Sequence, residues 1–121
     1  MRLTLLALLT LTLTACQQAG STLSIGSGED VIVYLYLTET EALSKVTFES
    51  HTSRHAVETL AGVEIIAYGF KCRGEGSVTI CTYSSGDTLC QGLYVERGYR
   101  PRLTQTKDSL LVDEYSGGVI Y

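Results

Sequence analysis

The stretch VIVYLYL, residues 31–37, decides the fold class. Every side chain in it is apolar or aromatic and three are β-branched, a composition that favours β-strands. Polar residues do not alternate with the apolar ones, and such a run is typical of a strand that is covered on both faces. We therefore expect residues 31–37 to form a central strand that is buried on both sides.

The residues after this strand carry a weaker signal. Thr38 is followed three positions later by Glu41, and this capping-box spacing predicts a short helical turn that continues to Lys45. Val46–Ser50 then has the composition of a second strand.

Residues 51–62 allow two interpretations. Ser53 is placed to cap a short helix that ends at Gly62, with small apolar residues along one side. Alternatively, Val57–Leu60 and Val63–Ile66 form a hairpin around the intervening glycine. We favour the helix.

From Val63 onward the pattern is that of strands separated by turns. The turn residues recur at about the spacing that is typical of sandwiches and barrels. Pro101, the only proline, falls in a loop, as a strand protein requires. The sequence predicts a mainly β fold, either a small antiparallel sandwich or a curled meander sheet, with at most one short helix. The expected strands are Val63–Cys72, Ser77–Tyr83, Thr88–Glu96, Arg102–Thr106, Leu110–Tyr115 and Val119–Tyr121.

Hairpin register selects a disulfide. A turn centred on Ser85 and Gly86 pairs residues outward along its two strands and places Cys81 directly opposite Cys90. Residues that lie opposite each other on antiparallel strands are about 4.5–5.5 Å apart at Cα, within disulfide reach. We therefore predict a bond between Cys81 and Cys90.

Cys72 is expected to stay a free thiol. A preceding turn at Gly74 and Glu75 would leave Cys72 and Cys81 on one face but four residues out of register, too far apart to bond. Cys72 then packs as a small apolar residue. The same register continues residues 63–96 into one meander sheet with apolar side chains on both faces, which we expect the N-terminal strands and a short helix to cover.

The N-terminus has the features of a secretory signal. Arg2 is positively charged, and the apolar run Leu3–Leu13 is too short to cross a bilayer as a mature helix, which takes ~20 apolar residues. The run leads into Leu13-Thr14-Ala15-Cys16, which resembles the lipobox of bacterial lipoprotein precursors. This resemblance covers only the first sixteen residues.

The resemblance implies a lipid anchor. Residues 1–15 would be removed and Cys16 would carry acyl chains, including palmitate, and two or more chains give stable membrane attachment. Gln17 stands where an aspartate would retain a lipoprotein in the inner membrane, so the resemblance implies the outer membrane, with the protein facing the periplasm. Residues 16–28, the lipidated cysteine and a segment rich in Gln, Ser, Thr and Gly, predict a flexible tether, and residues 29–121 predict a single domain.

The net charge of the mature chain argues against nucleic acid as a partner. Loss of Arg2 with the signal leaves eight basic and 13 acidic residues, a net charge of −5, which does not suit nucleic-acid binding. Tyrosine and arginine gather near residues 94–102, and this composition is typical of protein-binding hot spots. A solvated loop explains the same arginines. The candidate partner-binding residues are Tyr94, Arg97, Tyr99, Arg100 and Arg102.

Few residues suggest a catalytic or metal-binding site. His51, His55 and Glu58 would share one face of a continuous helix, but Ser53 as a cap excludes His51, and the zinc signature HExxH is absent because Thr52 replaces its glutamate. No phosphate-binding loop or nucleophile elbow is present. We expect no catalytic residue, metal or cofactor.

The sequence therefore favours a non-catalytic protein-binding module on a lipid anchor, a pilotin-like accessory protein for envelope or secretion-complex assembly with an envelope protein as its partner. An immunity or inhibitor lipoprotein that blocks a periplasmic enzyme or toxin needs the same features. A small metal-binding or enzymatic lipoprotein is the third hypothesis.

Overall fold

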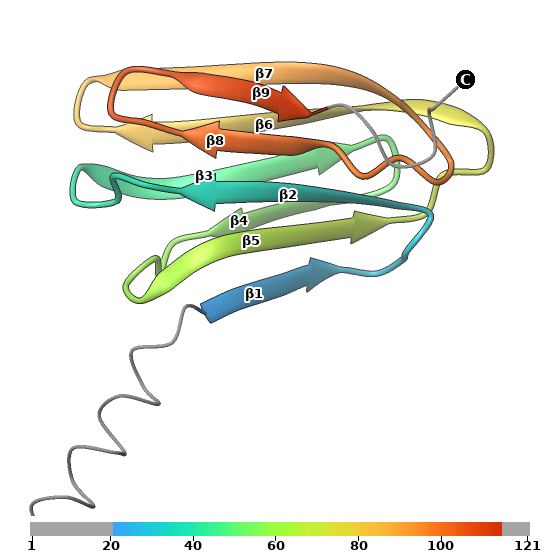
Figure 1. The fold of residues 1–121 in the computed structure, drawn as a ribbon, viewed down its shortest axis with the longest axis horizontal. Helices are drawn as coiled ribbons and strands as arrows, with labels where there is room; N and C mark the ends of the chain where they lie inside the picture. Colours follow the sequence, from blue (N-terminus) through green and yellow to red (C-terminus); the bar gives the residue numbers. More distant parts are fainter. Residues whose placement is uncertain (1–20, 115–121) are drawn as a thin grey trace, which may run out of the picture.

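A computed structural model describes residues 21–114, and these residues form nine strands and no helix. The strands build two sheets that pack as a small sandwich, so the predicted β fold is confirmed (Figure 1). The strands are β1 (Ser21–Gly26), β2 (Val31–Leu37), β3 (Leu43–Ser50), β4 (Arg54–Val57), β5 (Val63–Phe70), β6 (Glu75–Ser84), β7 (Asp87–Glu96), β8 (Arg102–Gln105) and β9 (Leu110–Glu114).

The two sheets differ in size. Sheet A has five strands in the order β1-β5-β2-β8-β9, and sheet B has four in the order β4-β3-β6-β7. Most neighbours are antiparallel, but β1 runs parallel to β5 and β2 runs parallel to β8. Strands β7 and β9 are the terminal strands of their sheets on the same side of the sandwich, at the top of Figure 1.

Strand β2 alternates between two environments. Val31, Val33 and Leu35 are completely buried between the sheets, whereas Ile32, Tyr34 and Tyr36 on the opposite face are only half-buried. The expectation that both faces are covered is therefore confirmed for the inner face, and the outer face is only partly covered. Its apolar outer positions are mostly tyrosines, which tolerate contact with water at the hydroxyl end.

The core is organised around Tyr68 on β5. Its ring packs against Phe48 and Phe70, with ring centroids 5.2 and 5.3 Å apart. Its hydroxyl lies 2.6 Å from the hydroxyl of Ser53 and donates to that of Ser50 at 3.0 Å, so the β3–β4 turn satisfies the polar end of a buried side chain. The aromatic core thereby fixes the turn that joins β3 to β4.

The expected single meander over residues 63–96 is wrong, because β5 and β6 belong to different sheets. The chain crosses from sheet A to sheet B between Phe70 and Glu75 instead of forming a hairpin. Both strands point their bulky apolar residues, such as Tyr68 and Ile80, into the space between the sheets. Packing face to face buries both sets, whereas a shared sheet would leave one set exposed.

Over residues 21–28 the expected tether is also corrected, because Ser21–Gly26 forms β1, whereas residues 16–20 lie outside the described residues. Gly26 and Gly28 then bring the chain close to the backbone of β5. A Cβ built on Gly69 would lie 2.2 Å from the Gly28 carbonyl oxygen, so only glycine fits there. The polar composition of residues 21–28 thus belongs to an edge strand and a tight crossing, and Leu23 and Ile25 pack against the core.

The two helical expectations are wrong as well. Residues 38–42 form a loop that leads directly into β3, and residues 54–57 form β4, which pairs antiparallel with β3. Neither the favoured helix nor the alternative hairpin over residues 57–66 is present, because β4 and β5 lie in different sheets. Among residues 21–114 no helix is long and apolar enough to cross a membrane. The predicted strand Val119–Tyr121 lies outside the described residues.

Candidate protein-binding edge

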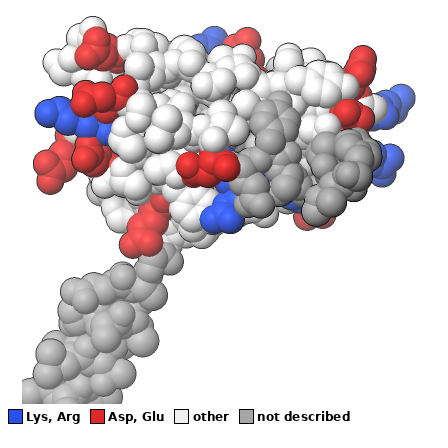
Figure 2. All heavy atoms as spheres, turned by 45° about the horizontal axis from the view of Figure 1, so that its top comes forward, with Lys and Arg blue, Asp and Glu red and all other residues white. Residues whose placement is uncertain are grey.

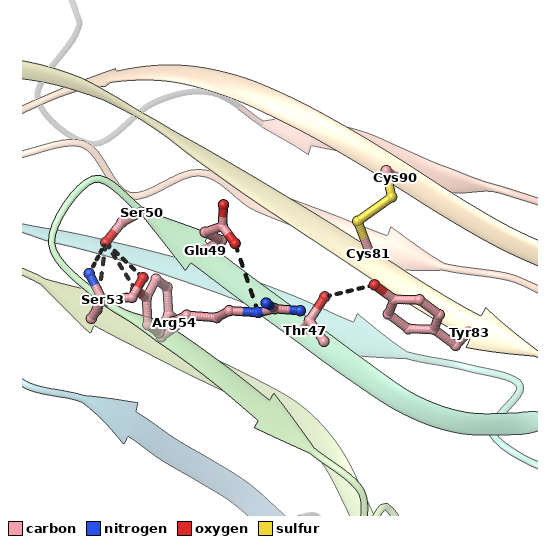
Figure 3. A network of polar contacts seen from close by, with 9 residues as sticks. Thr47, Glu49, Ser50, Ser53, Arg54, Cys81, Tyr83 and Cys90 are labelled. Atoms are coloured by element: carbon pink, nitrogen blue, oxygen red, sulfur yellow. Dashed lines mark hydrogen bonds and ion pairs between the residues drawn. A yellow bond between two sulfur atoms is a disulfide. The ribbon is translucent and has the colours of Figure 1, made fainter.

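The predicted hairpin of β6 and β7 is confirmed residue by residue, from Ser84 opposite Asp87 to Cys81 opposite Cys90. The disulfide between these cysteines is present, with a Cα–Cα distance of 4.1 Å. Figure 3 shows it joining the two strands on the outer face of sheet B. Cys72 is free and buried, as expected, although it lies after β5 in a crossing segment rather than in the predicted hairpin.

The arginines of the predicted partner-binding segment are engaged within the domain. The Arg100 guanidinium donates to the backbone carbonyls of Glu29, Asp30 and Tyr99 at 3.0, 3.3 and 2.9 Å. Arg97 forms an ion pair with Asp30 at 3.5 Å. These contacts fasten the β7–β8 loop to the β1–β2 loop and give both arginines a structural role.

The remaining members of that segment face in different directions. Tyr99 is buried, with only 6% of its surface exposed. Arg102 lies on the outer face of sheet A, with its guanidinium 4.9 Å from the centre of the Tyr36 ring. Tyr94 lies on the outer face of sheet B. The structure therefore does not bring the predicted residues together on one surface, and their role in binding stays a prediction.

The most exposed large apolar side chains lie on the two strands at one side of the sandwich. Among the described residues, Tyr94, Leu111 and Val112 are the large apolar side chains with the greatest exposure, at 51%, 51% and 36%. All three belong to β7 or β9, the strands that contact each other along one side of the sandwich, but they point in different directions. Tyr94 lies on the outer face of sheet B, Leu111 on the outer face of sheet A, and Val112 points toward the space between the sheets. We call this surface, formed by residues 87–96 and 110–114, the β7–β9 edge. Figure 2 brings this side of the sandwich forward and shows charged side chains at both ends of the sandwich and others near the middle of the view.

The backbone of β7 faces this edge at alternate residues. Arg97 donates its N–H to the carbonyl of the opposite residue Gly74 at 3.0 Å, which identifies a hydrogen-bonded pair. The short Cα–Cα distance of 4.1 Å between Cys81 and Cys90 identifies a non-hydrogen-bonded pair. Because the two kinds alternate, Thr88, Cys90 and Gly92 point their N–H and C=O groups away from β6.

These outward groups have little internal pairing. No strand of the described chain lies beside β7 on that side. The Gly92 carbonyl accepts a hydrogen bond of 3.3 Å from the side-chain amide of Gln91, which an incoming strand would replace. The outward backbone of β7 is therefore a template for strand pairing.

The other described edges are protected against such pairing. Strand β4 has only four residues and begins with Arg54, which forms an ion pair with Glu49. The pairing of β1 is irregular at its start, and that of β9 is irregular where Arg102 meets Glu114. Strand β7 has ten residues, pairs with β6 without irregularity, and has no charge or proline between its terminal residues. Short length, bulges and charge are the usual protections of an edge, and β7 lacks all three.

Acidic groups mark one end of β7. Glu75 and Glu96 lie directly opposite each other on β6 and β7, an arrangement of like charges that is unfavourable. Tyrosines offset it: Tyr94 donates to Glu75 at 2.8 Å and Tyr99 donates to Glu96 at 3.0 Å. The pKa of Tyr94 is raised well above its ordinary value, mainly because its hydroxyl donates to the Glu75 carboxylate.

Two other surfaces are less suited to a partner. The outer face of sheet B is polar, with an ion pair of 3.7 Å between Glu49 and Arg54 and a contact of 3.5 Å between Thr47 and Tyr83 (Figure 3). The outer face of sheet A has a shallow groove beside Tyr34, and glycines form part of its floor. The most exposed large apolar side chains of these faces are Tyr94 on sheet B and Leu111 on sheet A, and both lie on the terminal strands β7 and β9.

The histidines do not form a metal site with their neighbours. His51 lies in the β3–β4 turn against Phe70, and His55 lies on β4 against Tyr68. Residues 21–114 contain no group of three or more side chains that could hold a metal ion. Gly76 lies close to both His51 and Cys72, but the thiol is completely buried.

The sequence did not predict the β7–β9 edge, because the order of strands in each sheet decides which strands lie at an edge. One signal was available, namely the absence of charged residues and proline between Thr88 and Val95. Comparison of the chain with protein-family models, with curated proteins and with solved structures found no match.

Proposed function

We propose that this protein is an envelope lipoprotein, anchored through Cys16, whose β domain binds another protein without catalysing a reaction. The observation that carries the proposal is the β7–β9 edge, where the outward backbone groups of β7 lie beside the partly exposed Val112. An exposed strand edge without protection is a template for pairing with another chain. The lipobox resemblance at residues 13–16 supports an outer-membrane anchor that faces the periplasm.

The anchor is tested by mass and fractionation. We expect the mature protein to begin at Cys16, to carry acyl chains on that residue and to partition into the membrane. The Cys16→Ser variant should lose both the acyl mass and the membrane partition. A variant that stays in the membrane without acylation would contradict the lipid anchor.

Binding at the proposed edge is tested by site-specific photo-crosslinking in intact cells. A photoreactive residue at Val112 should give a discrete protein adduct, because this side chain lies on the β7–β9 edge. The matched control is Glu64, which is exposed on β5 of the same sheet. An equal adduct at Glu64, or none at Val112, would contradict the proposal. An enzyme or toxin as the partner would favour the inhibitor hypothesis over an assembly role.

A further inference from the structure

We infer that the β7–β9 edge accepts an extended strand from a different polypeptide, apolar at alternate positions and with a basic residue at the end beside Glu75 and Glu96. The inference deepens the proposed binding function by naming the form of the partner. Main-chain pairing along an exposed strand supplies affinity, and alternate side chains supply specificity.

The first argument is the backbone of β7. Thr88, Cys90 and Gly92 present donors and acceptors at every second residue, a spacing that another strand matches. The disulfide at Cys90 fixes β7 to β6, so its register cannot shift when a partner docks. An edge held in its bound geometry reduces the entropy that binding costs.

The second argument is the uncovered position of Val112. It lies opposite Leu103, whose side chain is completely buried between the sheets, so both residues point toward sheet B. Val112 nevertheless remains 36% exposed, because β7 and β9 are the last strands of their sheets on this side of the sandwich. A fifth strand beside β7 would cover Val112 with its inward side chains, and those side chains would need to be apolar.

The third argument is charge, which favours a different polypeptide over a second copy of this chain. A symmetric antiparallel pairing of two β7 strands centred on Gln91 would place Glu96 of one copy beside Gly86 and Asp87 of the other. That pairing brings acid near acid at both ends of the ribbon. A foreign strand with lysine or arginine at the Glu75 and Glu96 end would instead complement both carboxylates.

The test uses the mature chain, residues 16–121 with Cys16→Ser, labelled for amide hydrogen exchange by NMR. The probe is a capped peptide of alternating valine and threonine with one terminal arginine, made with the arginine at either end. We expect one of the two peptides to slow exchange of the Thr88, Cys90 and Gly92 amides at least tenfold. Replacing its arginine by glutamate should weaken binding about tenfold.

A matched pair of variants isolates the backbone contribution. Gly92→Pro removes an outward N–H that is outside the β6–β7 ladder, and proline is tolerated on edge strands. Gly92→Ala keeps that N–H, and its Cβ would meet no atom within 4 Å. We expect Gly92→Pro to weaken peptide binding at least tenfold and Gly92→Ala to leave it unchanged. The peptide carrying glutamate remains a second test in the wild-type protein if the proline variant fails to fold.

The other occupants give distinct results, each of which would overturn the inference. A dimer of the free protein that Gly92→Pro dissociates would identify a second copy at the edge. Slow exchange at Gly92 without peptide, relieved by deleting residues 115–121, would identify the chain's own C-terminus. Failure of both peptides to bind would exclude the strand partner. An adduct at Val112 in cells would still support the broader binding function.

Discussion

At the scale of single residues, the domain depends on a few close contacts that no pattern of hydrophobicity records. Gly69 allows the β1–β2 connection to pass over β5, with a Cβ at this position only 2.2 Å from the Gly28 carbonyl oxygen. Backbone atoms cannot yield as the end of a flexible side chain can. The residue is therefore a steric requirement of the fold.

Gly69→Ala is expected to lower the free energy of unfolding by about 1–3 kcal/mol, because the added methyl group forces the crossing away from β5. Urea denaturation of the non-lipidated mature chain measures the change. Gly92→Ala, which adds the same methyl group into open space on β7, should change stability by less than about 0.5 kcal/mol. Equal losses in both variants would show that the close approach is unimportant.

Tyr94 gives a prediction for alkaline pH. Its pKa in the folded protein is raised because the hydroxyl donates to Glu75, whereas in the unfolded chain it should return to about 10. The contribution of this bond to stability is therefore fully present below about pH 10 and is lost as the pH rises further. NMR titration should show Tyr94 neutral where ordinary tyrosines ionise, and Glu75→Gln should lower its pKa. An ordinary pKa for Tyr94 in the wild-type protein would refute the bond.

At the scale of elements, the β6–β7 hairpin is the unit that local sequence specifies best. A two-residue turn and a regular ladder bring Cys81 and Cys90 opposite each other, and the bond closes a short loop. The bond lies on the outer face of sheet B, so the core does not depend on it for packing.

Replacing both cysteines, Cys81→Ser with Cys90→Ser, should leave the fold intact and lower the free energy of unfolding by about 2–3 kcal/mol, from the restored loop entropy of the unfolded chain. Denaturation with and without a reducing agent measures the effect. The reductant should destabilise the wild-type protein but not the double variant. Sensitivity of the double variant would indicate a role for another cysteine.

The β2–β3 loop is held by one buried side chain, that of Gln105, which is 1% exposed. Its side-chain oxygen accepts from the backbone N–H groups of Thr38 and Glu39, each at 3.1 Å, and its amide donates to the Glu39 carbonyl at 2.7 Å. This arrangement replaces the helical turn expected from Thr38 and Glu41.

Gln105→Leu should lower the free energy of unfolding by about 1–3 kcal/mol, because the Glu39 N–H loses its acceptor and the Thr38 N–H keeps only the Gln105 backbone carbonyl at 3.3 Å. Thermal and urea denaturation measure the loss, and faster amide exchange at Thr38 and Glu39 locates it. Gln91→Leu is the control, since that side chain makes a single bond of 3.3 Å at the edge. A similar loss of stability in Gln91→Leu would show that the hydrogen bonds of Gln105 to the β2–β3 loop are not especially important.

At the scale of the whole molecule, β1 belongs to the domain and shortens the expected tether. Only residues 17–20 separate Cys16 from the first strand, so the start of β1 can lie at most about 18 Å from an acylated Cys16. The end of the sandwich that contains the start of β1 would therefore lie close to the membrane.

Truncation tests the assignment of β1. A chain that begins at Ser21 should be as stable as the mature chain, because it keeps every described strand. A chain that begins at Glu29 should lose about 2–4 kcal/mol, since it lacks the partly buried Leu23 and Ile25. Urea denaturation compares the two chains. Equal stability would mean that β1 contributes little and that the tether extends to residue 28.

The sequence by itself determined what depends on neighbours along the chain: the strand character of Val31–Leu37, the register of the β6–β7 hairpin and the disulfide that follows from it. These rest on side-chain periodicity and on a turn only a few residues away. The tertiary structure alone decided that β5 and β6 enter different sheets, that Ser21–Gly26 forms an edge strand and that Val112 stays uncovered. Each of those outcomes depends on which apolar faces meet across the sandwich, and residues far apart in the chain share that choice.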